Sequence, residues 1–475
     1  MSKLHYLSAT EALRLFRRRE VSPVELMQDV IDRCEAVNPV VNALTETMFE
    51  ESISAAREAE KCYLRLRPDE SEPGTELLGL PVAGKEKHAM RGRSFTQGLI
   101  HQTGAVASES HPVIERIVAA GGIVHARTTS PEFSCATVTH SPLWGVTRNP
   151  WNPTYSPGGS SGGAGASLAA GMATLATASD IAGSTRLPAC FTGTVGYKAP
   201  YGRIPGMGVL ASDWYRGDGP MARTVADVAL LAGVMSGRHP GDHATIEGSS
   251  QPMGPFDAVR GMRIALCIRL GDYLVAPEIE ENTRRTAAAL TAAGCEVEEI
   301  TLPWRSAEIV ETIFTHFGYI LGPAMAKATA GYEDQLAAYT RKFMEDAAAA
   351  AGRNTFLEGL EAEHRMQSEL AEAMEGFDAL LCPTSAVPQL DAEGDYLDGI
   401  TLDGQHLGHY WQAHMTSPFN IANRCPVLAV PSGASAEGVP TGVQIVGHPF
   451  AEATVFNVAA ALEAVAPWEA RRPSL

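Results

Sequence analysis

Three short segments carry side chains whose types and spacing could support hydrolytic chemistry. The stretch SPGGSSGG surrounds Ser160 and Ser161 with glycines, and the stretch SDIAGSTRLPA presents Ser184 after a tight Ile-Ala-Gly turn. Successive backbone N–H groups in such a turn can converge on a carbonyl oxygen that is becoming tetrahedral. Lys85 ends the apolar stretch GLPVAGK. Burial lowers the pKa of a lysine, and the neutral amine can then accept a proton.

A different serine site also fits part of this pattern. Residues 158–162 match G-x-S-x-G, the nucleophile elbow of α/β-hydrolases. The elbow requires a strand directly before the serine, whereas the preceding VTRNPWNPTYSP is rich in turn residues. It also requires a downstream histidine, and the candidates lie in no persuasive context: His316, His409, His414 and His448. No Lys-Ser/Thr pair follows the glycines, so the stretch is not a phosphate-binding P-loop.

Together with further motifs, the three segments resemble the amidase signature family of serine amidohydrolases. The resemblance covers nearly the whole chain and includes GVTRNPWNP, GPMARTVADVALL and PTGVQIVG in the family's order. It implies a Ser–cis-Ser–Lys triad, with the nucleophile at Ser184 and the base at Lys85. The bridging serine is implied at Ser160, on a cis peptide bond bracketed by glycines. Ser161 is expected to support this arrangement by hydrogen bonding.

The resemblance also implies how the reaction runs. Ser160 would pass a proton between Ser184 and Lys85 while Ser184 attacks the carbonyl. The oxyanion would be held by the backbone N–H groups of four consecutive residues: Ile181, Ala182, Gly183 and Ser184. No metal and no organic cofactor is implied. Glu86, Ala182 and Thr185 depart from the family's common pattern, and Ala182 adds a methyl group close to the scissile bond.

Other residues near these motifs are expected to support the site. Asp180 and Arg186 flank the turn and are predicted to form a structural ion pair rather than to act as catalysts. His88 follows Lys85 closely and is predicted to be a pocket-wall or structural residue. Five aromatic residues outside the shared motifs are further candidates for the substrate pocket, with core packing as the alternative role: Trp214, Tyr215, Trp304, Tyr319 and Trp411.

The elements that must position these residues indicate an α/β fold. Strands alternate with helices along the chain, which predicts a large mixed, mostly parallel β-sheet covered by helices on both faces. Residues 1–65 are predicted to be an N-terminal helical segment, because SATE and SPVE are typical of helix starts. Residues 66–475 are expected to form the amidase signature α/β domain, with 305–375 as a variable helical lobe near the substrate pocket.

Composition limits the partners. The chain has 475 residues and a formal net charge of −18, which disfavours binding to nucleic acid or to an anionic membrane. None of the eight cysteines forms a CxxC pair, so a zinc site is not indicated and the thiols are expected to be reduced. The N-terminal stretch lacks an apolar h-region, and the expected location is cytoplasmic. A homodimer is compatible with the sequence.

The sequence therefore predicts an amidohydrolase that cleaves a C–N bond of a small molecule. An aryl or alkyl carboxamide is the expected substrate, with hydrazides and carbamates as alternatives and a general esterase as a further one. The second candidate is the amidase subunit of a tRNA-dependent amidotransferase, which the net charge of −18 and the divergent KAPY segment disfavour. A catalytically silent binding protein is the third, and the retained triad argues against it.

Overall fold

The computed structural model describes residues 4–65, 72–247 and 256–475, and its centre is a mixed sheet of eleven strands. The strand order is β1-β3-β2-β6-β8-β7-β14-β15-β11-β9-β10. The strands are β1 (Leu44–Thr47), β2 (Pro81–Lys85), β3 (Ile123–Thr128), β6 (Leu175–Asp180), β7 (Val195–Lys198), β8 (Gly217–Ala222), β9 (Arg263–Leu266), β10 (Glu296–Glu299), β11 (Ala379–Pro383), β14 (Val427–Ala434) and β15 (Pro440–Gly447).

Two short hairpins lie outside this sheet. They pair β4 (His140–Ser141) with β5 (Gly145–Val146), and β12 (Ile400–Leu402) with β13 (Gln405–Leu407). Both hairpins are antiparallel.

The mixed α/β sheet is confirmed, but its expected parallel majority is not. Among the described residues, four neighbouring pairs in the large sheet are parallel and six are antiparallel. Every antiparallel pair contains β1, β7, β8 or β15. The parallel pairs include β2 with β3 and β9 with β10, in each of which a helix joins the two strands. Such a helical crossover returns the chain in the same direction.

Helices cover both faces of the sheet. Along β15, a Cβ built on Gly442 would lie 3.1 Å from Cys190 Cβ, in α6, and one built on Gly447 would lie 3.0 Å from Val455, in α14. Residues five apart on a strand point to opposite faces, so α6 and α14 lie on opposite sides. The central helices are α4 (Pro112–Ala119), α5 (Gly162–Ala169), α6 (Arg186–Thr192), α7 (Val225–Met235), α8 (Pro277–Ala292), α13 (Pro418–Ile421) and α14 (Glu452–Val465).

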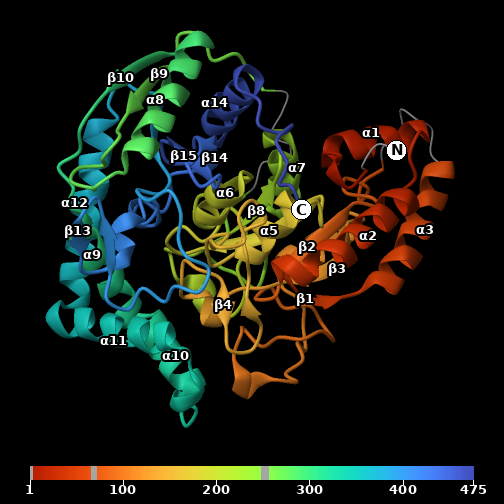
Figure 1. Ribbon diagram of the computed structural model, residues 1–475, viewed down its shortest axis with the longest axis horizontal. Coiled ribbons are helices and arrows are strands. Elements are labelled where there is room, and N and C mark those ends of the chain that lie inside the picture. Colours follow the sequence, from red (N-terminus) through yellow and green to blue (C-terminus); the bar gives the residue numbers. More distant parts are fainter. Residues whose placement is uncertain (1–3, 66–71, 248–255) are drawn as a thin grey trace.

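The N-terminal segment contains the expected helices and one unexpected strand. The helices are α1 (Ala9–Arg18), α2 (Pro23–Val41) and α3 (Phe49–Arg65), and Figure 1 shows them in red and orange at the end of the sheet where β1 lies. Ser22 and Glu25 form the predicted reciprocal capping box. At the other predicted box, Ser8 caps α1, but the Glu11 carboxylate binds Arg14 instead. Residues 66–71, just after the predicted boundary at 65, lie outside the described residues.

Four helices form a lobe where the sequence predicted one. They are α9 (Ser306–Tyr319), α10 (Leu321–Thr329), α11 (Ala338–Arg353) and α12 (Phe356–Ala373). Figure 1 shows the lobe in teal, on the side of the molecule away from α1 to α3. Within the described residues, no helix is both long enough and apolar enough to cross a membrane.

Candidate active site

Two adjacent parallel strands bring the candidate catalytic groups together. Strands β2 and β6 pair in parallel, with Val82 opposite Leu175, so their carboxyl ends lie at the same edge of the sheet. Lys85 is the last residue of β2, and β6 ends at Asp180, as predicted from the sequence. The chain then passes through the Ile-Ala-Gly turn to Ser184, just before α6.

Lys85 is fully buried among three serine hydroxyls. Its Nζ lies 2.8 Å from Ser160 Oγ, 2.9 Å from Ser161 Oγ and 3.0 Å from Ser179 Oγ. In the described part of the chain, no carboxylate oxygen lies within 4.0 Å of this amine. Ser160 and Ser161 hold the positions expected from the sequence, while Ser179 is a contact that the sequence analysis did not identify.

The surroundings of Lys85 favour its uncharged form. Burial lowers its pKa well below the ordinary value, and the neighbouring Lys87 cation lowers it further. Glu86 points away, because its carboxylate accepts hydrogen bonds from Thr96 and from the Gln97 amide. The amine is therefore placed among hydroxyls with no counter-ion to hold a proton on it.

The two glycines directly before Ser160 are each required for a different physical reason. Gly158 has a φ of +81°, a conformation that side chains with a Cβ rarely adopt. Gly159 has an ordinary φ, but a Cβ there would lie 2.7 Å from the backbone oxygens of Ala136 and Val138. The Gly159–Ser160 peptide bond is cis, as the sequence analysis predicted.

The predicted oxyanion turn has three amides available rather than four. The Gly183 N–H donates to Asp180 Oδ1 at 2.7 Å, so it is already engaged. In the described chain, no hydrogen-bond acceptor is found for the amides of Ile181, Ala182 and Ser184. The sequence analysis did not identify this difference, although an aspartate side chain commonly accepts a hydrogen bond from a backbone amide a few residues on.

Asp180 and Arg186 form the predicted ion pair and fix the turn. The guanidinium binds both carboxylate oxygens, at 3.0 and 2.9 Å, and both side chains are fully buried. Although burial opposes the charged form, Arg186 and Asn420 lower the pKa of Asp180 to about 2. Arg186 also donates to the Thr416 carbonyl and to Gln444, which ties the start of α6 to the C-terminal part of the chain.

A cavity of about 290 Å³ opens onto these groups. Ser160, Ser179 and Ser184 line it together with polar residues that the sequence analysis did not place there: Lys87, Gln97, His111, Ser134, Asp213 and Arg216. The apolar side chains on its wall are Phe95, Phe133, Ile181, Met207, Val209, Leu210 and Leu321. The lobe contributes Leu321, at the start of α10.

The aromatic residues predicted for the pocket pack elsewhere. Trp214 contacts His316 edge-to-face, Tyr215 stacks on His316 at 3.7 Å, and Trp411 packs on Phe314. Trp304 packs near Phe419, and the Tyr319 hydroxyl donates to the Asn354 carbonyl. None of these five residues, nor His88, is among those that line the cavity. Tyr215, Trp304 and Trp411 are buried in the core, Trp214 is partly buried and Tyr319 is exposed.

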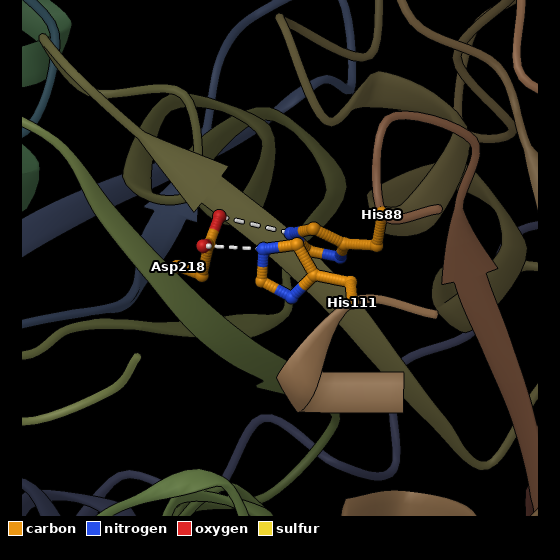
Figure 2. Close-up of side chains that lie close together, drawn as sticks. All are labelled: His88, His111 and Asp218. Atoms are coloured by element: carbon orange, nitrogen blue, oxygen red, sulfur yellow. Dashed lines mark hydrogen bonds and ion pairs between the residues drawn. The ribbon is translucent and has the colours of Figure 1, made fainter. Parts of the chain in front are cut away.

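His88 instead belongs to a buried cluster beside the cavity. Figure 2 shows the Asp218 carboxylate facing the rings of both His88 and His111, which lie next to each other. The His88 Nε2 lies 2.9 Å from Asp218 Oδ1, and the His111 Nε2 lies 3.3 Å from Asp218 Oδ2. Burial lowers the pKa of His88 to about 3, so its ring is neutral.

The hydrogen bonds around this cluster set the tautomers of both rings. The His111 Nδ1 accepts the Val113 amide, so its Nε2 carries the proton and faces Asp218. Thr177 Oγ1 accepts the Lys85 amide, which leaves its hydroxyl proton for the His88 Nδ1. These three side chains are also the set in the described residues whose ligand atoms lie close enough to hold a metal ion. The His88 Nε2 is already hydrogen-bonded to the carboxylate, whereas the buried His111 Nε2 makes no hydrogen bond within the described chain.

One of the unpredicted cavity residues had a signal in the sequence. Lys87 lies only two positions after Lys85, in the turn that follows β2, so it is near the site because it is near in the chain. Arg216 had none, because it reaches the site through the long-range pairing of β8 with β6. His111 had none either, because it caps α4 and lies beside the site through a hydrogen bond from its amide to the Ala89 carbonyl.

The comparisons with known proteins agree with this site. A family model described as Amidase matches residues 25–456. An acylamidase from Rhodococcus erythropolis is 32% identical over 99% of this chain and 98% of its own. A glutamyl-tRNA(Gln) amidotransferase subunit from Thermosynechococcus vestitus is 30% identical over 98% of this chain and 99% of its own. A bacterial aryl acylamidase structure superimposes with a TM-score of 0.88 at 25% identity, covering 98% of both chains.

The fold and the lysine–serine site define the class of protein: it is a hydrolase that acts on C–N bonds. The chain belongs to the amidase signature family.

Proposed function

We propose that this protein hydrolyses small-molecule linear amides through an acyl-enzyme on Ser184. The observation that supports it most directly is the 2.8 Å contact between Lys85 Nζ and Ser160 Oγ, at a cavity that Ser184 also lines. A buried amine without a counter-ion is a base that works near neutral pH. A carbonyl carbon in the cavity would meet a serine nucleophile and a turn with free amides.

The hydrogen bonds around Lys85 support a direction for the proton relay. Ser161 Oγ lies 3.5 Å from the Ser179 carbonyl and can donate its proton there, so it accepts from Lys85. Ser179 Oγ can accept the second N–H of a neutral amine. The lone pair of Lys85 then faces Ser160, whose proton it can take as Ser160 takes the proton of Ser184.

The proposed reaction then proceeds in two balanced stages. Ser184 Oγ adds to the carbonyl carbon, and its proton passes through Ser160 to Lys85 while the amides of Ile181, Ala182 and Ser184 stabilise the oxyanion. The C–N bond breaks, and the proton returns through Ser160 to the leaving nitrogen. Water, deprotonated along the same path, then releases the acid and restores Ser184.

The test measures hydrolysis of simple anilides by the purified protein, and the release of aniline reports the rate. Ser184→Ala and Lys85→Ala are each expected to lower kcat by about 10³-fold or more while the circular dichroism spectrum stays unchanged. The double variant is expected to be scarcely worse than either single one, because the residues act as a unit. Ser236→Ala, a half-buried serine at the end of α7, is the control. Losses that multiply in the double variant would contradict a shared relay.

Mass spectrometry identifies the nucleophile independently. After reaction with a fluorophosphonate, the adduct is expected on the peptide that contains Ser184. An adduct on Ser160 instead would reverse the assignment of the two serines.

The alternative function is that of a component of an amidotransferase complex, which the 30% identity to a glutamyl-tRNA(Gln) amidotransferase subunit supports. Such a protein works with partner chains. Purification from the native host under gentle conditions distinguishes the two functions. A stoichiometric partner chain, together with anilide hydrolysis that depends on it, would favour the amidotransferase.

A further inference from the structure

Two cationic side chains reach the cavity wall from strands on either side of β6. Lys87 lies two residues after β2, and Arg216 lies directly before β8. In the sheet order, β2 and β8 are the two neighbours of β6, which carries Ser179. Both cations therefore lie at the same edge of the sheet as Lys85, and both line the cavity that contains Ser184.

Neither cation has an anionic partner. Within the described residues, no carboxylate oxygen lies within 4.0 Å of Lys87 or Arg216. The buried Nε of Arg216 has no hydrogen-bond acceptor. The Lys87 ammonium has a single long contact, 3.4 Å to Ser179 Oγ. Burial and the nearby Arg216 charge lower the pKa of Lys87 to about 7, which an incoming anion would reverse.

The His88–Asp218 contact locks the two cation-bearing segments together. His88 is adjacent to Lys87, and Asp218 lies two residues after Arg216, so their 2.9 Å hydrogen bond joins the end of β2 to β8. The same His88 ring contacts Thr177 of β6 at 2.8 Å. Asp218 is hydrogen-bonded to His88, its other oxygen lies 3.3 Å from His111 Nε2 (Figure 2), and it does not pair with either cation. The two positive charges are thus fixed in place, although nothing in the described chain neutralises them directly.

Asp213 is a carboxylate that also lines the cavity, and its partner is a histidine that does not line the cavity. Asp213 Oδ1 lies 2.7 Å from His316 Nε2 and accepts the Tyr215 amide. Although burial opposes the charged ring, Asp213 and Glu363 raise the pKa of His316, so it carries a proton more readily. Asp213 therefore pairs with His316 through Oδ1, while its buried Oδ2 has no hydrogen-bond partner among the described residues. The charges on the cavity wall that have no ion-pair partner in the described chain are those of Lys87 and Arg216.

We propose that the cavity selects amides that carry a carboxylate, which Arg216 and Lys87 bind while Ser184 attacks the amide carbonyl. The inference rests on the proposed amidase function and names its substrate class. Arg216 presents a planar fork that matches two carboxylate oxygens, and Lys87 supplies a point charge beside it. The apolar side chains on the cavity wall, which include Phe95, Phe133 and Leu210, accommodate the carbon skeleton.

The experiment compares matched anilides with and without a carboxylate. The first pair is glutaric acid monoanilide and its methyl ester, which tests a carboxylate on the acyl side. The second pair is 4-acetamidobenzoate and acetanilide, which tests a carboxylate on the amine side. At low ionic strength, the carboxylate is expected to raise kcat/KM by about tenfold or more in at least one pair. Arg216→Gln and Lys87→Met are each expected to reduce that ratio by about fivefold or more.

Several controls keep the result interpretable. Arg305→Gln and Lys327→Met remove exposed cations outside the cavity and are expected to leave the ratio as in the wild type. Arg216→Lys keeps the positive charge but loses the planar guanidinium, so it should retain part of the carboxylate preference. This variant tests the role of Arg216 even if Arg216→Gln folds poorly. Circular dichroism reports the folding of each variant.

The outcomes separate this inference from the proposed function. Hydrolysis of the neutral anilides with no carboxylate preference, or a preference that survives in both cavity variants, overturns the inference alone. If no anilide is hydrolysed, the proposed function fails. The inference is then judged by calorimetry, where tighter binding of glutaric acid monoanilide than of its ester, lost in Arg216→Gln, supports it and equal binding rejects it.

Discussion

At the scale of single residues, the state of Lys85 decides whether the site can work. An ordinary lysine has a pKa near 10.4 and is charged at neutral pH. Here burial and the Lys87 and Arg216 cations lower that pKa, while Asp218 and Asp180 oppose the effect from farther away. Only the free amine can take the proton of Ser160, so activity should fall as the pH falls and Lys85 becomes protonated.

The pH profile of Lys87→Met tests this electrostatic coupling. Because the Lys87 cation lowers the pKa of Lys85, its removal raises that pKa, and the acidic limb of kcat/KM should move to higher pH by about 0.5–1 unit. The measurement uses acetanilide, which has no charge of its own. Lys327→Met, which removes an exposed lysine of α10, should leave the limb in place. A limb that stays fixed or moves to lower pH in Lys87→Met contradicts the coupling.

At the scale of elements, the loop before α5 is shaped by the backbone against which it packs. Gly159 lies against the backbone oxygens of residues 136 and 138, with no room for a side chain. We expect Gly159→Ala to destabilise the fold by about 1–3 kcal/mol and to displace Ser160, with a large loss of activity. Gly352→Ala is the matched control, because that glycine lies in α11 and a Cβ added there would have nothing within 4 Å. It should be neutral or stabilising by up to about 1 kcal/mol. Thermal unfolding and anilide hydrolysis measure both effects.

The ion pair at the start of α6 is expected to matter far more than an exposed one. Arg186→Met leaves Asp180 buried without its counter-ion, which should cost about 3–5 kcal/mol. Arg284, which pairs with Glu280 and Glu299 on the surface, is 46% exposed, and Arg284→Met should cost no more than about 1 kcal/mol. Chemical denaturation of both variants gives the comparison. Equal losses would show that the buried pair adds no specific stability.

At the scale of the whole molecule, the proposed proton relay, the oxyanion turn and the Lys87 and Arg216 cations all lie at one edge of the sheet. The His88, His111 and Asp218 cluster lies beside them, and the His88 Nε2 is already hydrogen-bonded to the carboxylate, while Lys87 and Arg216 oppose a further cation. We therefore expect anilide hydrolysis to survive exhaustive dialysis against a chelator, with elemental analysis to confirm removal of metal. Activity that is lost on chelation and restored by a divalent metal would assign this cluster a catalytic role.

The expected homodimer stays a prediction that gel filtration with light scattering can test. A partner chain at the cavity mouth would change access to the site but not the groups that line it.

Much of the catalytic centre could be predicted from local sequence. The glycine-bracketed serines, the Ile-Ala-Gly turn and the lysine at the end of an apolar strand are each encoded within about ten residues. Backbone conformation and strand termination depend on such short stretches. The Ser22–Glu25 cap and the Asp180–Arg186 pair follow for the same reason, since their partners are three and six residues apart.

Only the tertiary structure decided which residues surround that centre. His88 and Asp218 are 130 residues apart, and they meet because β2 and β8 both pair with β6. The alternation of apolar and polar residues within a strand does not say which strands lie beside it. Local pattern therefore could not predict the antiparallel pairs, nor that Lys87 and Arg216 would line the same cavity. The aromatic residues show the same limit: composition marks them as large and apolar, but only packing decides between core and cavity. The sequence thus indicated the groups proposed to react, and the fold determined which side chains line the cavity beside them.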